Sequence, residues 1–176
     1  MIFRQAKLQD ITQIMEIISL GIESLKKQGS PQWQDGYGPT QEQIEQDIEN
    51  GAAYVLVTEK VIAYAALIAG IDPVYTAITE GTWCTSQDYV SIHRVVVDSR
   101  LTGNGLAQQL LNDLIITSQQ MGFNDIRIDT HPVNTGMQKV IQKAGFTYRG
   151  KVNFPIPYGN RWAYQYFIDS KRRTLL

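Results

Sequence analysis

Two glycines, Gly103 and Gly105, are the residues whose spacing most directly indicates chemistry. They follow an apolar stretch at residues 89–97 and precede a run with helical periodicity at residues 106–120. Glycine lets the backbone turn sharply and leaves no Cβ to block a ligand. The amides at the start of a helix, together with the positive end of its dipole, then favour an anion such as a phosphate or pyrophosphate. This stretch therefore predicts a site for a phosphate-bearing ligand.

The two histidines of the chain are the side chains best suited to proton transfer near neutral pH. His93 lies in the apolar stretch 89–97, and His131 directly follows a second apolar stretch at 125–130. We expect both to face one cleft. The alternative is that His93 packs in the core and that His131 orients the turn made with Pro132.

The elements that must position these residues are two strands, each followed by a helix. Residues 89–97 are rich in β-branched residues and predict an inner strand, and residues 133–143 predict a helix after the strand at 125–130. Period-two alternation places His93, Val95 and Val97 on one face of the first strand. Arg94 and Val96 would lie on the other face, where Arg94 pairs with a buried acid or meets an anionic acceptor, pairing being the favoured interpretation.

The remaining periodicity completes a chain of alternating elements. We expect strands at 2–6, 53–58, 61–69, 146–152 and 162–168, a helix from about residue 8 to 27, and a short helix after the capping box of Thr40 and Gln43. The order is β-α-α-β-β-β-α-β-α-β-β. It predicts a single α/β domain over residues 1–176, with a mixed, mostly antiparallel sheet of about seven strands flanked by about four helices. The stretch 70–88 gives no clear signal.

Composition narrows the classes of partner. Sixteen Lys and Arg against 17 Asp and Glu give a net charge of −1, which favours neither nucleic acid nor a membrane surface as a partner. The single Cys84 excludes an intrachain disulfide and a zinc site built from several cysteines, and we expect no metal. We see no signal peptide and no apolar run of roughly 20 residues. These features favour a soluble cytoplasmic protein, with residues 171–173 as a solvated basic tail.

The element order, the glycine turn and residues 134–146 together resemble the GNAT superfamily of acetyl-CoA-dependent N-acetyltransferases. The cofactor turn of that family reads Gln/Arg-x-x-Gly-x-Gly/Ala, and here Gly105 and Ala107 match while Thr102 replaces the first residue. A register two residues earlier also fits the letters but displaces the helix. In the second signature of the family, Asn134 and the Lys-x-Gly-Phe ending at position 146 match, but Ile141 replaces the usual tyrosine, the common general acid.

The resemblance implies an enzyme that transfers acetyl from acetyl-CoA to a primary amine by direct attack in a ternary complex. We expect a catalytic set of His93, His131 and Asn134, the histidines because an imidazole can accept the proton of the amine. The resemblance places the acetyl-CoA site at Val95, Val96, Val97, Thr102, Gly103, Asn104, Gly105, Leu106, Ala107, Asn134 and Met137. The acceptor would be a small-molecule amine or a peptide amine. We expect Trp33 and Tyr37, from an aromatic loop, to contact it.

Two other functions compete with this interpretation. A dinucleotide enzyme would use Gly103 and Gly105 as the start of Gly-x-Gly-x-x-Gly, but Gln108 stands at the third glycine, and three strands precede the turn, so this class is rejected. The other candidate is a non-catalytic module of the same fold that binds acetyl-CoA as a sensor or scaffold. The replacements at Thr102 and Ile141 favour it. A homodimer is compatible with either function.

Overall fold

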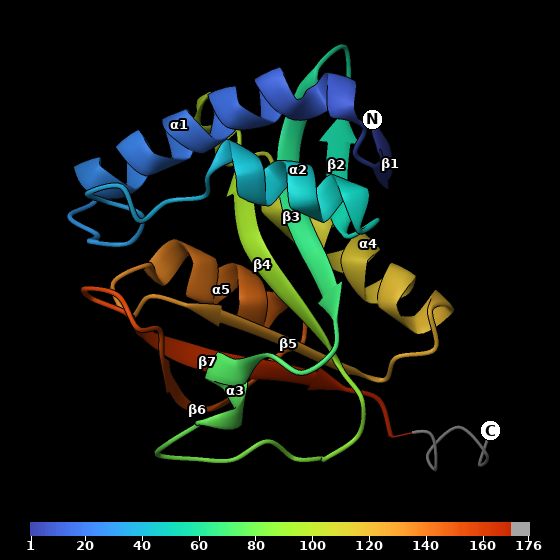
Figure 1. The fold of residues 1–176 in the computed structure, drawn as a ribbon, viewed down its shortest axis with the longest axis vertical. Coiled ribbons are helices and arrows are strands. Elements are labelled where there is room, and N and C mark those ends of the chain that lie inside the picture. The colour runs from blue at the N-terminus through green and yellow to red at the C-terminus, as the bar shows by residue number, and fades with distance from the viewer. Residues whose placement is uncertain (170–176) are drawn as a thin grey trace.

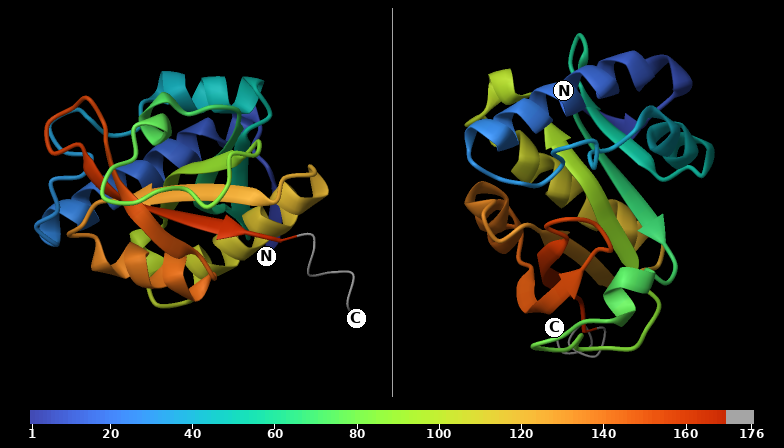
Figure 2. Two further views of the ribbon diagram at one scale, coloured as in Figure 1. Left: turned by 90° about the horizontal axis from the view of Figure 1, so that it is seen from below. Right: turned by 60° about the vertical axis from the view of Figure 1, so that its left-hand side comes forward.

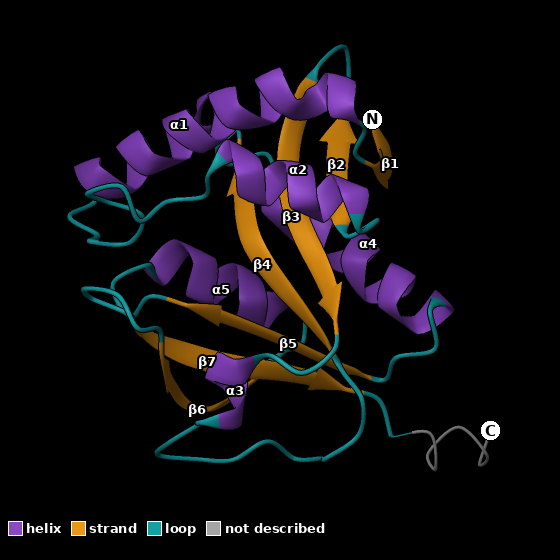
Figure 3. Ribbon diagram, viewed as in Figure 1, coloured by secondary structure: helices purple, strands orange, loops and turns teal. Residues whose placement is uncertain are grey.

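The computed structural model describes residues 1–169, so the basic tail predicted at 171–173 lies outside the described residues. Those residues form a seven-stranded sheet in the order β1-β2-β3-β4-β5-β7-β6 (Figures 1 and 3). All neighbouring pairs are antiparallel except β4 and β5, which are parallel. The strands are β1 (Ile2–Gln5), β2 (Ala53–Val57), β3 (Val61–Ala69), β4 (Val90–Val97), β5 (Asp125–Thr130), β6 (Thr147–Asn153) and β7 (Asn160–Phe167).

Helices cover both faces of the sheet, and each face has its own core. The helices are α1 (Ile11–Lys27), α2 (Gln41–Glu49), α3 (Pro73–Thr76), α4 (Leu106–Gln120) and α5 (Thr135–Lys143). On one face the apolar residues of α1 and α2 pack against β2 and β3, and on the other those of α4 and α5 pack against the middle of the sheet. The predicted α/β architecture with a mostly antiparallel sheet is confirmed.

The strands β4 and β5 separate after a short stretch of pairing. Only Val90, Ser91 and Ile92 of β4 have partners on β5. Beyond them β4 continues alongside β3, whereas β5 runs beside β7, so the sheet opens between its two central strands (Figures 1 and 2). The backbone amides of β4 at 95–97 therefore have no partner strand on the β5 side.

A β-bulge at Arg94 overturns the predicted facing of the β4 side chains. Arg94 has a φ of 56°, and the register with β3 shifts at this point. A bulge adds one residue to a strand, so the alternation of side chains is reversed beyond it. Val95 consequently packs in the same core as Ile92, whereas His93 faces the opposite side with Asp72. The prediction that His93, Val95 and Val97 share a face was wrong, because it assumed an unbroken strand.

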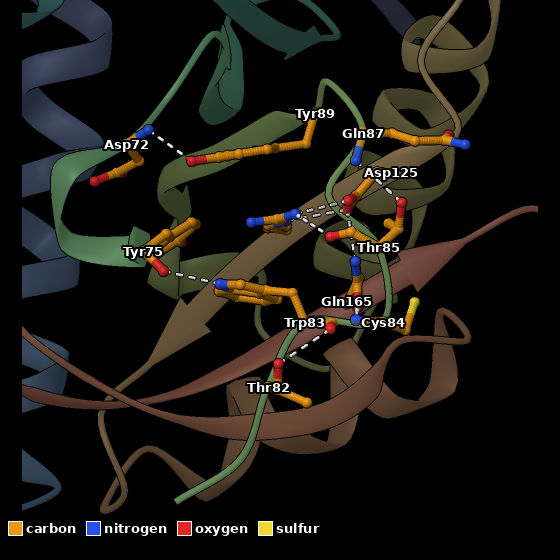
Figure 4. A network of polar contacts seen from close by, with 11 residues as sticks. Asp72, Tyr75, Thr82, Trp83, Cys84, Thr85, Gln87, Tyr89, Asp125 and Gln165 are labelled. Carbon is orange, nitrogen blue, oxygen red and sulfur yellow. Dashed lines mark hydrogen bonds and ion pairs between the residues drawn. The ribbon is translucent and has the colours of Figure 1, made fainter. Parts of the chain in front are cut away.

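The stretch 70–88, which gives no clear signal in the sequence, is ordered around two residues of the sheet. The Arg127 guanidinium on β5 lies between the rings of Trp83 and Tyr89, 4.3 and 3.7 Å from their centroids. The Cys84 amide donates to Gln165 Oε1 on β7 at 2.9 Å (Figure 4). Cation–π contacts, the hydrogen bond to Gln165 and apolar contacts with Val152 and Ala163 thus hold this segment against β5, β6 and β7. It also supplies α3, a short helix that the sequence did not predict.

Candidate active site

A cleft of about 840 Å³ opens where β4 and β5 separate. It is bounded by the loop between α1 and α2, by β4, by the turn before α4, by α5 and by the loop between β6 and β7. Such a break in the pairing of a sheet leaves backbone groups available to a ligand. Most of the residues predicted from the sequence as site residues line this cleft: Trp33, Tyr37, His93, Val95, Val96, Val97, Thr102, Gly103, Gly105, Leu106, Ala107, Asn134 and Met137.

The glycine turn forms one end of the cleft. Gly103 and Gly105 have φ values of 90° and 72°, in the left-handed region that glycine adopts without strain, and no atom outside the immediate chain lies within 4 Å of where a Cβ would be. Gly105 is the N-cap of α4 and offers no side chain to the first amides of that helix. The N-terminus of α4 thus has the open backbone donors that suit an anion.

The neighbouring side chains of the turn bond to the backbone of the turn itself. Thr102 Oγ1 donates to the Ser99 carbonyl at 2.8 Å, and Asn104 Nδ2 donates to the Leu101 carbonyl at 3.0 Å. Asn104 is not among the residues that line the cleft. These bonds fix the shape of the turn, and the binding role of Asn104 stays a prediction.

His93 is bonded to an acid that the sequence analysis did not select. Its Nε2 lies 2.9 Å from Asp72 Oδ2. Asp72 is the N-cap of α3, where its Oδ1 accepts from the Val74 amide at 2.9 Å. Burial raises the pKa of Asp72, but the bond and charge of His93 and the backbone amides outweigh it, so that the pKa falls below its usual range. The carboxylate therefore stays ionised at neutral pH and orients the imidazole.

A second buried polar group adjoins this pair. Tyr75, on α3, donates its hydroxyl to Asp129 Oδ2 at 2.7 Å, and Arg161 Nε lies 3.7 Å from Asp129 Oδ1. Burial raises the pKa of Asp129, although the charges of His93 and Arg161 oppose the shift. Burial and the neighbouring Asp129 likewise raise the pKa of Tyr75 well above its usual value. Asp129 and Arg161 line the cleft, so its wall contains ionisable groups.

The His131 side chain bonds to the backbone of the turn that follows it, and not to this group of side chains. It is buried, its Nδ1 accepts from the Val133 amide at 3.2 Å, and it is not among the residues that line the cleft. Burial and the positive charge of Arg161 lower its pKa, which favours the neutral imidazole. The geometry matches the alternative given above, in which His131 orients the turn with Pro132. Asn134 caps α5, its Oδ1 accepting from the Met137 amide at 3.1 Å.

The residue at the position of the usual tyrosine, Ile141, is completely buried in the core beneath α5. Tyr148 and Tyr158 are the phenols nearest to this position in the sequence, and Tyr148 lies on β6, where it packs against Trp162 and Tyr164. Neither Tyr148 nor Tyr158 lines the cleft. The described residues therefore place no phenol from these positions where the family's general acid is expected.

The functional residues that the sequence analysis missed come from the segment before β4. Asp72 and Tyr75 lie in the stretch that gave no clear signal, yet Asp72 followed by Pro73 is a helix-start pattern, an N-cap with proline at the first helical position. That pattern could have located α3. Its position beside His93 could not be deduced, because 21 residues separate Asp72 from His93 in the sequence.

Comparison with known proteins agrees with this architecture. The model of the acetyltransferase (GNAT) family matches residues 20–146, and the chain belongs to this family. A GNAT-family acetyltransferase from Streptococcus agalactiae is 37% identical over 96% of both chains, with a TM-score of 0.88. One from Listeria monocytogenes shares the fold at 24% identity, covering 95% of this chain and 94% of its own, with a TM-score of 0.75. A search of curated proteins gave no match.

No helix within residues 1–169 is long and apolar enough to cross a membrane. The same part of the chain holds no group of three or more His, Cys, Asp or Glu side chains placed to bind a metal ion.

Proposed function

We propose that the protein is an N-acetyltransferase that transfers acetyl from acetyl-CoA to a primary amine by direct attack in a ternary complex. The observation that carries this proposal is the separation of β4 from β5 beside the open N-terminus of α4. Backbone amides that can bind a phosphate lie at one end of the cleft, and unpaired strand amides lie along its side. This arrangement suits a ligand with a pyrophosphate and an amide-containing arm.

The cleft residues fit acetyl-CoA in three respects. The amides at residues 103–107 would hold the pyrophosphate, and the edge of β4 at 95–97 would hold the amides of the pantetheine arm, as an added strand does. Lys139 and Lys143 of α5 add positive charge to the same cleft. When bound, acetyl-CoA supplies an activated thioester.

His93 is the group that we propose as general base. An alkyl amine with a pKa near 10.4 is almost wholly protonated at neutral pH and cannot attack until it loses a proton. Asp72 occupies Nε2, which leaves Nδ1 of the neutral imidazole as the proton acceptor. Asn134 would act by fixing the start of α5, and Trp33 and Tyr37 would border the acceptor. With Ile141 at the tyrosine position, the CoA thiolate would leave without a proton from a phenol. Its conjugate thiol has a pKa of roughly 8.5.

Calorimetric titration with acetyl-CoA and with CoA tests the cofactor site. Gly105→Arg should abolish binding, because the side chain would enter the space in front of the α4 amides. Gly122→Arg is the matched control: both glycines have positive φ, of 72° and 90°, and neither has an atom within 4 Å of an added Cβ. Gly122 follows the other end of α4, so its variant carries comparable backbone strain and should bind as the wild type does.

The outcomes separate the proposal from its alternatives. Binding lost in Gly105→Arg and retained in Gly122→Arg supports the cofactor site. Absence of binding by the wild type contradicts the proposed function. Binding of acetyl-CoA without thiol release, whatever amine is supplied, favours the non-catalytic module, the interpretation to which the buried Ile141 points.

A further inference from the structure

A second, smaller cavity of about 280 Å³ adjoins the active-site cleft. We infer that it holds the body of the acceptor, and that the acceptor is a free primary amine on a compact apolar group without a carboxylate. The inference rests on the proposed acetyltransferase function and goes further by naming the class of substrate.

The position of the small cavity follows from the residues that it shares with the cleft. His93, Arg94 and Phe154 line both. A group bound in the small cavity and one bound in the cleft would therefore meet at the proposed base. An amine at this junction is placed to lose its proton to His93 and to attack a thioester held along β4, as direct transfer requires.

The wall of the small cavity is mostly apolar, with one polar group that lacks a partner. Ile68, Ile71, Pro73 and Phe154 supply the apolar surface. Ser91 also lines the cavity, and its buried Oγ has no hydrogen-bond partner among the described residues. A buried hydroxyl without a partner costs free energy unless a ligand or water satisfies it. An apolar pocket with a few fixed polar groups is typical of small-molecule sites.

The charges around the small cavity favour an ammonium group over a carboxylate. Arg94 is the cation in its wall, but its guanidinium is already bound to Asp47 by two hydrogen bonds of 2.8 and 2.6 Å. Asp72 contributes a carboxylate whose pKa lies below its usual range, so that it is ionised at neutral pH. An incoming ammonium would compensate Asp72, whereas an acceptor carboxylate would lie beside a like charge without a free cation.

The transfer itself balances without a further reactant. The ammonium first gives one proton to His93, which releases it to solvent, and the neutral amine nitrogen then forms the C–N bond to the acetyl carbonyl carbon. The C–S bond breaks with its electron pair on sulfur, and the thiolate takes up the second proton that the nitrogen loses. The products are the N-acetylated amine, CoA and one proton.

Matched pairs of acceptors test the substrate class. We would compare 3-methylbutylamine with leucine, and 2-phenylethylamine with phenylalanine, by thiol release at saturating acetyl-CoA. Each pair differs by one carboxylate on the same apolar body. We expect kcat/KM to be higher for the amine by about tenfold or more. A tripeptide beginning with leucine tests the peptide alternative. Equal or better turnover of the amino acids or the tripeptide would overturn the inference.

A pair of variants tests the location. Ile71, 79% exposed at the wall of the small cavity, can be replaced without disturbing the core. Ile71→Lys should raise KM for the preferred amine roughly tenfold, because the introduced ammonium would repel the ammonium of the acceptor near Asp72 and His93. Ile116→Lys makes the same change at another exposed isoleucine, on α4, and should leave KM unaltered. Equal KM values in both variants would remove the small cavity from acceptor binding.

Acetyl-CoA titration of the same samples separates the two levels of proposal. Wild type that fails to bind acetyl-CoA overturns the proposed function and the inference with it. Wild type that binds acetyl-CoA but acetylates only carboxylate-bearing or peptide acceptors overturns the inference alone. Wild type that binds acetyl-CoA and acetylates no amine favours the non-catalytic module and overturns both. Ile71→Lys should bind acetyl-CoA with unchanged affinity, so a weaker affinity would show that the lysine disturbs the cleft.

Discussion

At the scale of single residues, the chemistry of the cleft depends on what surrounds His93. An isolated histidine on a strand is as compatible with core packing as with catalysis. The bond to Asp72, the contact with the Tyr75 ring at a centroid distance of 5.6 Å and the position between two cavities distinguish this one. His131 was an equally good candidate from the sequence, but its ring nitrogen Nδ1 accepts a hydrogen bond from a backbone amide.

Replacing His93 tests the proposed base. His93→Gln keeps a polar side chain that can bond to Asp72 but cannot accept a proton near neutral pH. We expect kcat to fall by roughly 10²–10⁴-fold, the usual contribution of general base catalysis. The affinity for acetyl-CoA, measured by calorimetry, should be unchanged. A kcat within a few-fold of wild type would show that the amine is deprotonated by another route.

Asp72→Asn is the companion variant, because asparagine is also a good N-cap and preserves the start of α3. In the wild type, the Asp72 carboxylate has a lowered pKa and carries its negative charge throughout the pH range in which amine transfer is measured. That charge stabilises the protonated imidazole, so its removal should move the acidic limb of the pH–rate profile to lower pH, together with a lower kcat. A reduced kcat with an unmoved profile would assign Asp72 a purely structural role.

At the scale of elements, local signals decided what could be predicted. The helix at 106–120 was predicted with the bounds of α4, because leucine periodicity and a glycine at its start are both visible in the sequence. The bulge at Arg94 was not predicted, because the strand carries no local signal for it, and the Arg94 side chain bonds there to Asp47 of α2, 47 positions away in the sequence. The same limit hid the position of α3 beside His93, although the Asp72 and Pro73 pattern at the start of α3 is local.

The junction of β1 and α1 shows how one acid joins two elements. Asp10 accepts two hydrogen bonds from Arg4, at 2.7 and 2.9 Å, and one from the Lys7 amide at 2.8 Å. The Arg4 bond, opposed by burial and aided by the Lys7 amide, lowers the pKa of Asp10. A carboxylate whose pKa is lowered by folding stabilises the native state above its unfolded pKa, and loses this contribution as the pH falls through its folded pKa.

Asp10→Asn should therefore destabilise the protein in a pH-dependent manner. At pH 7 we expect a loss of about 1–3 kcal/mol in the free energy of unfolding, as for hydrogen bonds to charged groups. The difference from wild type should shrink as the pH falls below about 4, where the wild-type carboxylate also becomes protonated. Urea unfolding at several pH values measures it. A constant difference across this range would contradict the ionic origin of the effect.

At the scale of the whole molecule, the described residues form two parts that share a short seam. One part contains β1–β4 with α1 and α2, and the other contains β5, β7, β6 and α5 (Figures 1 and 2). They are joined along the sheet by three residue pairs between β4 and β5, with α4 packed across both. The cleft at the end of this seam is thus a place where the fold leaves backbone donors unpaired and where a ligand can supply the missing contacts.

A ligand bound along this seam should stabilise the entire fold. Binding to the native state alone adds roughly 2.7 kcal/mol at a ligand concentration of 100 Kd. For a chain of 176 residues, this corresponds to a rise in Tm of about 5–10 °C. We expect acetyl-CoA and CoA to produce this rise in wild type and in Gly122→Arg, but not in Gly105→Arg, by thermal unfolding at matched concentrations. An equal rise in all three proteins would place the ligand away from the α4 turn, because a side chain at residue 105 could then not exclude it.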